Sequence, residues 1–408
     1  METLRTIEPS AAVETIRAGG LCAVPTETVY GLAASGLDAH AVEKIYAVKG
    51  RPENKPLSLL VAGKEALARF GRDLPDAASK LAERFWPGPL TIVVRADPEI
   101  PAIVRAGGET VGLRCPDHPL TLSVLRRLAL PLAAPSANPS GEPSPVTAEQ
   151  VLGYFDGRIE CVLDGGPCGV GRESTILDLS RTPYAILRQG ALPRETIGAA
   201  LRESMTVIGI TRGTGGGKTT ALRAVRERGG LVLDCDEVYH ELLETDEGLL
   251  GELRENFPEA FPDGSFDRKA LGRVVFADEA KLLRLNEITH RHVAEAVERA
   301  LTDFAWQGGT LAAVDAIALI ESGIAARCTA VLGISAPEEL RVERLMAREG
   351  ISREYAKMRI AAQKPDAWFR ERCDHFLVND GTKAEFKTKC EQWLDQILAT
   401  QKGETANE

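Results

Sequence analysis

The sequence predicts an α/β protein of two domains, residues 1–204 and 205–400. Short apolar runs alternate with helical patterns along both halves, which is typical of strands separated by helices. In the second half a glycine-rich loop follows the first apolar run, at residues 209–218. Strand–helix alternation that starts with such a loop favours a doubly wound parallel sheet.

The first half mixes strand patterns with proline and glycine turns, which predicts a mixed sheet. The expected strands are residues 21–24, 57–61, 90–94, 110–114, 132–134 and 176–179. Helical patterns at 41–49 and 80–85 separate some of them.

A domain boundary is predicted between Ser204 and Met205. Residues 194–204 form an amphipathic helical pattern, and Met205 opens an apolar run like the start of a second reading frame. Because no Gly/Ser-rich or proline-rich spacer lies between them, we expect a stiff connection.

The second half alternates more regularly. Strands are expected at 206–210, 230–233, 311–315 and 329–334, helices at 218–227 and 337–348, and a long helical stretch in between.

The overall composition limits the classes of partner. The formal net charge is -10, which disfavours tight binding to nucleic acid or to an anionic membrane. None of the 8 cysteines forms a CxxC pair, so free thiols in a reducing compartment are expected. The first residues carry no apolar stretch typical of a signal peptide, and we expect a cytoplasmic protein.

The glycine-rich loop of the second half has the chemistry of a phosphate cradle. Consecutive glycines let backbone N–H groups turn toward phosphate oxygens, and the helix that follows presents its positive N-terminus to the same anion. Lys218 would reach the β- and γ-phosphates, and the Thr219 hydroxyl would hold Mg²⁺. The strict G-x-x-x-x-G-K-[ST] pattern is broken by Arg212 in its first position. The predicted nucleotide-binding residues are Gly213, Gly215, Gly216, Gly217, Lys218, Thr219 and Thr220.

Two carboxylates follow the next predicted strand, at Asp234 and Asp236. If both leave the strand at i and i+2, they point the same way and suit a base and a metal-linked partner. The alternative is a helix-capping aspartate beside a solvated one.

With these motifs, residues 206–395 resemble dephospho-CoA kinase. Further matching segments are DGSFDR at 263–268, the stretch from Asp315 to Glu321, and Asn379–Gly381. The resemblance implies transfer of the γ-phosphoryl group of ATP to the ribose 3′-hydroxyl of dephospho-CoA. It assigns Asp236 as base, Lys218 as catalytic cation, and Arg344 with Arg348 to a helical lid over the phosphates. Arginines at that spacing also occur on ordinary helix surfaces, and His290-Arg291 departs from the family's His-Pro.

In the first half, three cations fall within seven residues: Lys49, Arg51 and Lys55. Two prolines in this stretch exclude a continuous helix, so a loop is expected. Cations fixed on a loop suit a polyphosphate, whereas a merely solvated surface is the alternative.

Five more motifs end predicted strands with a small polar residue or an arginine. They are WPGPLT at 86–91, GLRCP at 112–116, PSANPSG at 135–141, REST at 172–175 and LRQG at 187–190. With PTETVYGL at 25–32 they resemble the YrdC-like threonylcarbamoyl-AMP synthase family over residues 5–200. Leu60 departs from the histidine of longer members.

That family condenses L-threonine, bicarbonate and ATP into threonylcarbamoyl-AMP and pyrophosphate for the t6A modification of tRNA. The resemblance implies that threonine is bound by Thr28, Arg114, Ser136 and Ser174. It implies that the nucleotide is bound by Arg51, Lys55, Thr110, Asn138, Ser144 and Arg188. Lys49 and Arg51 would neutralise charge that develops on the phosphates.

The sequence therefore predicts a bifunctional enzyme that uses ATP and Mg²⁺. Its partners would be L-threonine, bicarbonate, ATP and dephospho-CoA, and threonylcarbamoyl-AMP would pass to the tRNA-modifying transferase machinery. The alternative keeps the synthase active and makes the second half a degenerate kinase that binds nucleotide as a regulatory module, with Arg212 as its main support.

Overall fold

A computed structural model describes residues 2–211 and 214–404, with side chains described through residue 400. The described chain divides into two compact units. The first comprises the residues up to Ser204 together with Trp306–Gly308, and the second comprises Met205–Ala305 and the residues from Gly309 onward. Arg212 and Gly213, both singled out in the glycine-rich loop, lie outside the described residues.

The first unit contains a mixed sheet, as predicted. Within the described residues its strand order is β1-β9-β2-β3-β8-β4-β7-β6-β10-β11, and β5 pairs with β6. Its strands are β1 (Leu4–Thr6), β2 (Cys22–Val24), β3 (Gly31–Ser35), β4 (Ser58–Leu60), β5 (Gly71–Arg72), β6 (Leu90–Ala96), β7 (Thr110–Arg114), β8 (Leu132–Ala133), β9 (Cys161–Leu163), β10 (Thr175–Asp178) and β11 (Ala185–Arg188). The neighbours β4/β7 and β6/β10 are parallel, whereas β6/β7 and β10/β11 are antiparallel.

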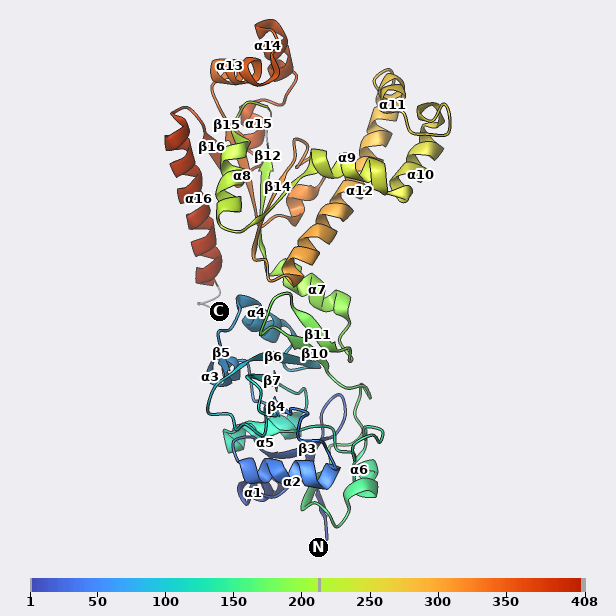
Figure 1. The fold of residues 1–408 in the computed structure, drawn as a ribbon, viewed down its shortest axis with the longest axis vertical. Helices are drawn as coiled ribbons and strands as arrows, with labels where there is room; N and C mark the ends of the chain where they lie inside the picture. Colours follow the sequence, from blue (N-terminus) through green and yellow to red (C-terminus); the bar gives the residue numbers. More distant parts are fainter. Residues whose placement is uncertain (1, 212–213, 405–408) are drawn as a thin grey trace. The chain divides into compact units, whose positions relative to one another are not determined.

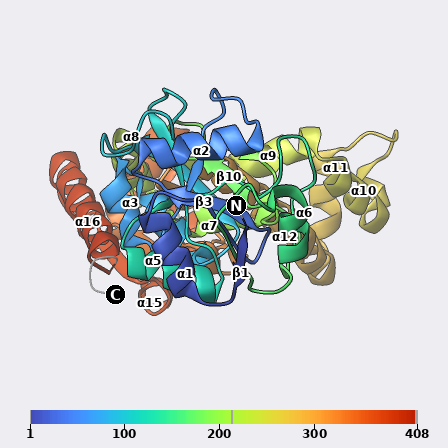
Figure 2. The same cartoon turned by 90° about the horizontal axis from the view of Figure 1, so that it is seen from below.

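Helices cover both faces of this sheet. They are α1 (Pro9–Arg17), α2 (Ala39–Lys49), α3 (Glu65–Phe70), α4 (Asp76–Phe85), α5 (Pro119–Leu128), α6 (Ala148–Phe155) and α7 (Arg194–Glu203). Figure 2 shows α2 on one side of β3, and α1 with α5 on the other. In α1 the buried residues Ala12, Val13 and Ile16 have the i, i+1, i+4 spacing of an amphipathic helix.

All six strands predicted in the first half are present, with ends shifted by a residue or so. Sequence patterns missed β1, β3, β5, β9 and β11. The omission of β3 has a physical cause: Gly31–Ser35 is a fully buried strand of mostly small residues, paired antiparallel with β2. A continuous run without polar alternation gives no period-2 signal.

The second unit is a doubly wound parallel sheet, also as predicted. Its strand order is β13-β14-β12-β15-β16, and every neighbouring pair is parallel. Its strands are β12 (Thr206–Thr211), β13 (Leu231–Asp234), β14 (Leu311–Asp315), β15 (Ala330–Ser335) and β16 (His375–Val378). Because β12 lies between β14 and β15, the strand order reverses there, which is where ligands bind in such sheets.

The helices of the second unit are α8 (Lys218–Glu227), α9 (Cys235–Thr245), α10 (Glu247–Asn256), α11 (Arg268–Val275), α12 (Glu279–Trp306), α13 (Glu338–Glu349), α14 (Arg353–Ala361), α15 (Asp366–Arg370) and α16 (Lys383–Glu404). Short 3₁₀ turns occur at Pro258–Ala260 and Ile324–Arg327. Figure 1 shows α8 and α16 side by side on one face of the sheet. Leu222 of α8 and Phe386 of α16 share a buried cluster with Ile208 and Leu332 of the strands.

A helical pair, α13 and α14, stands beyond the carboxyl end of β15 (Figure 1). Val342, Leu345 and Ala356 form a small buried cluster between these two helices. Helix α13 carries Arg344 and Arg348, which the sequence assigns to a helical lid. Because the core of this helical pair is small, its packing gives it less stability than the sheet has.

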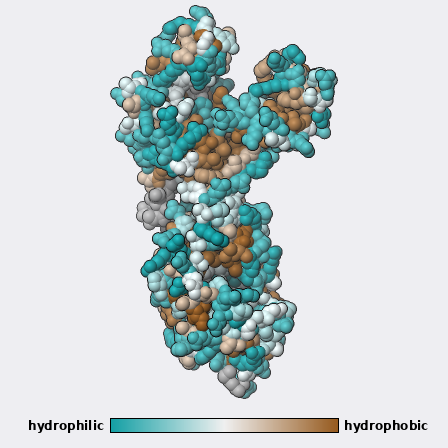
Figure 3. All heavy atoms as spheres, in the orientation of Figure 1, coloured by the Kyte–Doolittle hydropathy of each residue, from teal (hydrophilic) through white to brown (hydrophobic). Residues whose placement is uncertain are grey.

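No helix in the described part of the chain is long and apolar enough to cross a membrane. Figure 3 shows mostly hydrophilic surface on both units, with apolar patches that include the region of α10–α12.

Candidate functional sites

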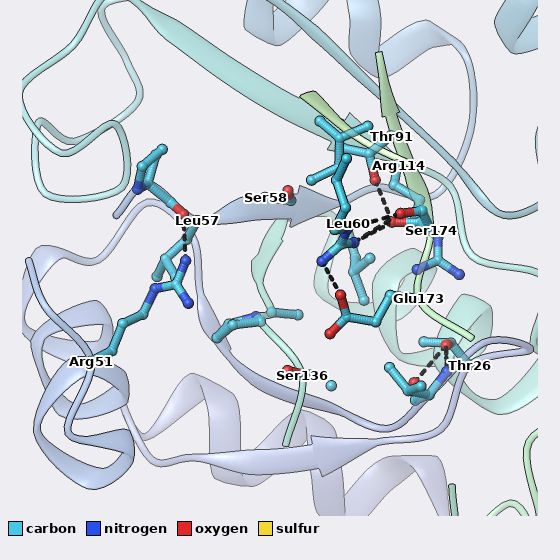
Figure 4. A pocket seen from close by; sticks show the side chains of 17 residues that line it. Thr26, Arg51, Leu57, Ser58, Leu60, Thr91, Arg114, Ser136, Glu173 and Ser174 are labelled. Atoms are coloured by element: carbon cyan, nitrogen blue, oxygen red, sulfur yellow. Dashed lines mark hydrogen bonds and ion pairs between the residues drawn. The ribbon is translucent and has the colours of Figure 1, made fainter. Parts of the chain in front are cut away.

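A pocket of about 170 Å³ lies on one face of the sheet in the first unit (Figure 4). Alternate side chains of neighbouring strands form its floor: Ser58 and Leu60 on β4, Arg114 on β7 and Thr91 on β6. Side chains two residues apart point to the same face of a strand, so the pleat aims all of them into one cavity. The walls come from loops that carry Thr26, Arg51, Pro135, Ser136, Glu173 and Ser174.

Two arginines reach this pocket because they lie in one cross-strand row. Arg114 pairs with Leu60 on β4, and the antiparallel pair Ile92/Leu113 brings Arg114 beside Thr91 on β6. Ile176 on β10 pairs with Thr91 on one side and Arg188 on the other. Residues in one row share a face of the sheet. The parallel and antiparallel pairings thus bring together two arginines that are far apart in the sequence.

Arg114 is fixed before any ligand binds. Its Nη2 atom donates to Glu27 Oε1 at 2.7 Å and to Thr28 Oγ1 at 2.8 Å, and its Nε atom donates to the Gly88 carbonyl at 3.1 Å. The side chains of Arg114 and Glu27 are only 8% and 14% exposed. Thr28, expected to bind threonine, is fully buried and instead holds Arg114 in place.

Arg188 and Glu173 form an ion pair within the pocket. Ser144 Oγ donates to Glu173 Oε1 at 2.9 Å, and Arg188 Nη2 donates to the Ser174 carbonyl at 2.9 Å. Gly190 permits this arrangement, because a Cβ there would lie 2.3 Å from the Glu173 carbonyl oxygen. Burial lowers the pKa of Arg188 from its usual value.

Lys49 is the last residue of α2, in agreement with the helical pattern at 41–49, so of the three cations expected on the loop it lies just before the loop begins. The helix ends at Gly50, whose φ of 60° suits glycine, and the loop begins there. Lys49 is buried, and its Nζ atom donates to the carbonyl oxygens of Ser136, at 2.5 Å, and Asn138. Burial, with a smaller effect from the charge of Arg51, lowers the pKa of Lys49 to about 8. Lys49 therefore lies behind the pocket wall that Ser136 forms.

Asn138 is also behind this wall and is 6% exposed. Its Nδ2 atom donates to the carbonyl oxygens of Pro139, at 3.0 Å, and Glu142, at 2.6 Å. Its Oδ1 atom is buried and has no hydrogen-bond partner among the described residues. A buried acceptor without a donor costs free energy, and a hydrogen bond from a ligand would remove that cost.

The structure separates two predicted nucleotide-binding residues from the others. Lys55 is exposed and does not line the pocket. Thr110 starts β7, and at about 3.3 Å per residue it lies about 13 Å from Arg114 at the other end of the strand. Arg51 does line the pocket, and its guanidinium donates to the carbonyls of Lys55 and Pro56.

Glu173, Thr91 and Glu27 are site residues that sequence reasoning did not single out. Glu173 and Thr91 line the pocket, and Thr91 Oγ1 lies 2.9 Å from Ser174 Oγ. Glu173 and Glu27 each lie within a quoted motif, but their pairing with an arginine far along the chain left no local signal.

In the second unit the loop before α8 has the backbone shape of a phosphate cradle. Gly215 has a φ of 83° and Gly217 a φ of 105°, conformations that favour glycine. A Cβ at Gly217 would lie 2.3 Å from Asn379 Nδ2. Gly217 is also the N-cap residue of α8, so the loop leads directly into the positive end of that helix. Thr219 is exposed in the first turn.

The carboxyl ends of the parallel strands bring charged groups to the same edge. Asp234 ends β13 and pairs in register with Asp315, which ends β14. Lys218 Nζ donates to Asp315 Oδ1 at 2.5 Å. Burial raises the pKa of Asp315, which the charge of Lys218 opposes. Asp315 therefore holds the loop lysine at this edge.

Asp234 and Asp236 do not leave a strand as an i, i+2 pair, so that prediction is wrong. Asp234 caps α9, and its carboxylate accepts from the backbone N–H groups of Asp236, at 2.9 Å, and Glu237, at 3.4 Å. Asp236 lies exposed in the first helical turn. Burial, followed by the charges of Asp315, Asp234 and Asp236, raises the pKa of Cys235 to about 12, so the three carboxylates share one neighbourhood.

Of the two lid arginines, only Arg344 contacts the loop. It donates to the Gly215 carbonyl at 3.2 Å, and the neighbouring Arg341 donates to the Thr214 carbonyl at 3.2 Å. Arg348 instead pairs with Glu349 at 2.5 Å on the helix surface. The loop contacts therefore come from Arg344 and Arg341, three residues apart on α13, and the lid role of Arg344 with Arg348 stays a prediction. Asn379 completes this contact by donating from Nδ2 to the Gly216 carbonyl at 3.0 Å.

These two sites define the class of protein: an α/β chain with an arginine-rich small-molecule pocket in one unit and a phosphate-binding loop in the other. The Sua5/YciO/YrdC family model, described as telomere recombination, matches residues 14–190. The dephospho-CoA kinase family model matches residues 206–385.

Known proteins resemble the two halves separately. A threonylcarbamoyl-AMP synthase of Pyrococcus abyssi is 46% identical over 188 residues, 46% of this chain and 55% of that protein. A Mycobacterium tuberculosis protein that carries the same name provisionally is 37% identical over 191 residues, 47% of this chain and 88% of that protein. A dephospho-CoA kinase of Geobacter sulfurreducens is 34% identical over 190 residues, 46% of this chain and 96% of that protein.

The chain belongs to the Sua5/YciO/YrdC family through its first half and to the dephospho-CoA kinase family through its second. It spans little more than half the length of the Pyrococcus abyssi relative.

Proposed function

We propose that the first unit condenses L-threonine, bicarbonate and ATP into threonylcarbamoyl-AMP and pyrophosphate. The observation that carries this proposal is the pocket lined by Arg51, Arg114 and Arg188 together with the hydroxyl groups of Ser136 and Ser174. Three cations in a small cavity suit a substrate with a carboxylate and a second with phosphates. The family to which the first half belongs includes proteins named for this activity.

In this proposal the chain assembles and orients its reactants, and no protein nucleophile is needed. Arg114, held by Glu27 and Thr28, presents a fixed guanidinium to the α-carboxylate of threonine. Arg188 and Arg51 would neutralise the negative charge that develops on the α-phosphate and the departing pyrophosphate. Asn138 Oδ1, which is buried behind the wall, would accept from a nucleotide donor only after the wall shifts. Lys49 acts from behind the wall, and a small shift is needed for it to touch a phosphate.

We propose that the second unit phosphorylates the ribose 3′-hydroxyl of dephospho-CoA. The glycine loop and the N-terminus of α8 would hold the phosphates of ATP, Lys218 would exchange Asp315 for a phosphate oxygen, and Arg344 would close from the lid. Asp236, exposed beside Asp234, would orient the acceptor hydroxyl. Phosphoryl transfer requires mostly such positioning.

A magnesium ion would accompany the nucleotide and neutralise phosphate charge. In the described residues no group of three or more His, Cys, Asp or Glu side chains is arranged to hold a metal ion. Magnesium that is bound with ATP takes most of its ligands from phosphates and water. The Thr219 hydroxyl in the first turn of α8 is the side chain that we propose as its protein ligand.

Two variants of the second unit test these roles. Lys218→Ala should lower ATP affinity and phosphate transfer together, because it removes a phosphate contact. Asp236→Asn keeps the shape of the side chain and should spare ATP binding while removing transfer. Calorimetry of ATP binding beside a transfer assay separates the two effects. An equal loss of ATP binding in both variants contradicts the assigned roles.

The alternative, a degenerate kinase unit that binds nucleotide only, rests on Arg212, which lies outside the described residues. An active wild-type kinase whose rate changes by no more than about tenfold in Arg212→Gly supports the enzyme, where tenfold corresponds to about 1.4 kcal/mol. An inactive wild type that Arg212→Gly restores supports the regulatory module.

Further parts of the proposal concern organisation and partners. Residues 1–204 and 205–400 should fold separately as two domains. Threonylcarbamoyl-AMP would pass to the tRNA-modifying transferase machinery, and we expect a cytoplasmic protein without tight binding to nucleic acid or membrane.

A further inference from the structure

The arginine-rich pocket of the first unit contains a carboxylate that charge neutralisation of a nucleotide does not explain. Among the residues that line this pocket, Glu173 is the one acidic side chain. Figure 4 shows its carboxyl group in the middle of the pocket, between Arg51 on one side and Arg114 on the other. A negative charge at this point weakens binding of a polyphosphate, so its presence calls for another role.

Glu173 is held in place but retains binding capacity. Its Oε2 atom accepts from Arg188, and its Oε1 atom accepts from Ser144 at 2.9 Å. An ionised carboxylate has about four acceptor sites, so these two bonds leave room for further donors. The side chain is 33% exposed, which means that a ligand in the pocket can reach it.

A free α-amino acid carries two opposite charges, an α-carboxylate and an α-ammonium group. Arginines bind the first but repel the second, so a pocket that selects an amino acid needs an anion near its arginine. Glu27 does not meet this need. Its Oε1 atom accepts from Arg114, its Oε2 atom accepts from the backbone N–H of Asp117, and it does not line the pocket.

We propose that Glu173 binds the α-ammonium group of L-threonine and determines that the pocket takes an amino acid rather than a hydroxy acid. This inference rests on the proposed synthase function of the same site. Arg114 and Glu173 then form a complementary pair for the zwitterion. Arg188 and Ser144 keep the carboxylate aimed at the substrate and reach the nucleotide through their other atoms.

The test compares two ligands on the full-length protein by calorimetry, with a non-hydrolysable ATP analogue present. One ligand is L-threonine and the other is its hydroxy-acid analogue, in which a hydroxyl group replaces the ammonium group. The wild type should prefer L-threonine by at least about tenfold, because loss of one partner of a hydrogen-bonded charge pair has a large cost. In Glu173→Gln this preference should fall to about one, and affinity for the ATP analogue should not weaken. Glu142→Gln, which removes one charge from an exposed position that does not line the pocket, should keep the preference.

Each other outcome overturns the inference in a recognisable way. An unchanged preference in Glu173→Gln means that Glu173 does not contact the ammonium group. An equal loss of affinity for both ligands means that it acts only by holding Arg188. If the wild type binds neither ligand while the ATP analogue binds, the proposed synthase function fails and the inference fails with it.

Discussion

Replacement of Gly217 by alanine tests the phosphate-binding loop at its most constrained point. Gly217 has a φ of 105°, and a non-glycine residue in a left-handed conformation costs about 1–2 kcal/mol. The new methyl group would lie 2.3 Å from Asn379 Nδ2, which donates to the Gly216 carbonyl at 3.0 Å. Displacement of Asn379 loses a hydrogen bond of about 0.5–1.5 kcal/mol.

The two costs add to about 1.5–3.5 kcal/mol, which corresponds to about a ten- to several-hundred-fold loss of ATP affinity if the loop leaves its binding geometry. The assay is calorimetric ATP binding to full-length protein that carries Arg188→Ala, which disables the first pocket. Gly229→Ala is the matched control, because Gly229 has a φ of 75° but nothing within 4 Å of a new Cβ. It should lower stability and keep ATP affinity. Unchanged ATP affinity in Gly217→Ala would refute the assignment of this loop.

Three further predictions follow from single side chains. Arg51→Ala should strongly reduce threonine-dependent pyrophosphate release, whereas Lys55→Ala should reduce it little, because Arg51 lines the pocket and Lys55 is exposed. Equal losses in the two variants would mean that Lys55 also contacts a substrate. Burial lowers the pKa of Lys49 from 10.5 to about 8, so affinity of the first unit for ATP should weaken as pH rises through about 8. Between pH about 8 and pH 10.5 the free energy of unfolding should rise with pH, because in this range the unfolded chain keeps the Lys49 proton that the folded chain has lost. If neither the free energy of unfolding, measured with denaturant, nor the affinity for ATP changes with pH in this range, the burial of the Lys49 charge is contradicted. In the second unit Arg344→Ala should raise KM for ATP by about tenfold and Arg348→Ala should not, and a similar rise in both variants would favour the sequence-based lid.

Much of the fold could be predicted because its signals are local. The apolar run at 311–315 and the helix at 218–227 have the predicted bounds, since length and periodicity identify each without a tertiary contact. In contrast, β3 has small buried residues and no alternation, and β16 (His375–Val378) is half-buried throughout. From the sequence alone, neither β3 nor β16 can be distinguished clearly from a loop.

The candidate sites divide in the same way. Arg114 and Arg188 could be proposed because each lies in a motif, GLRCP or LRQG, whose role the family resemblance implies. Glu173 could not, because its role depends on Arg188 across the β10–β11 hairpin and on Ser144 from another loop. Arg341 was missed for the same reason: its partner, the Thr214 carbonyl, lies in a loop more than a hundred residues earlier in the chain. Asp234 shows a local failure, because a strand end and a helix N-cap have the same aspartate signal.

The central claim is that one chain carries two independent ATP-dependent activities. The most direct measurement is a pair of assays on the full-length wild type: pyrophosphate release that depends on threonine and bicarbonate, and phosphorylation of dephospho-CoA by ATP. We expect both activities, with the first lost in Arg188→Ala and the second lost in Lys218→Ala. A wild type that lacks either activity, or a variant in one unit that abolishes both, would contradict the account.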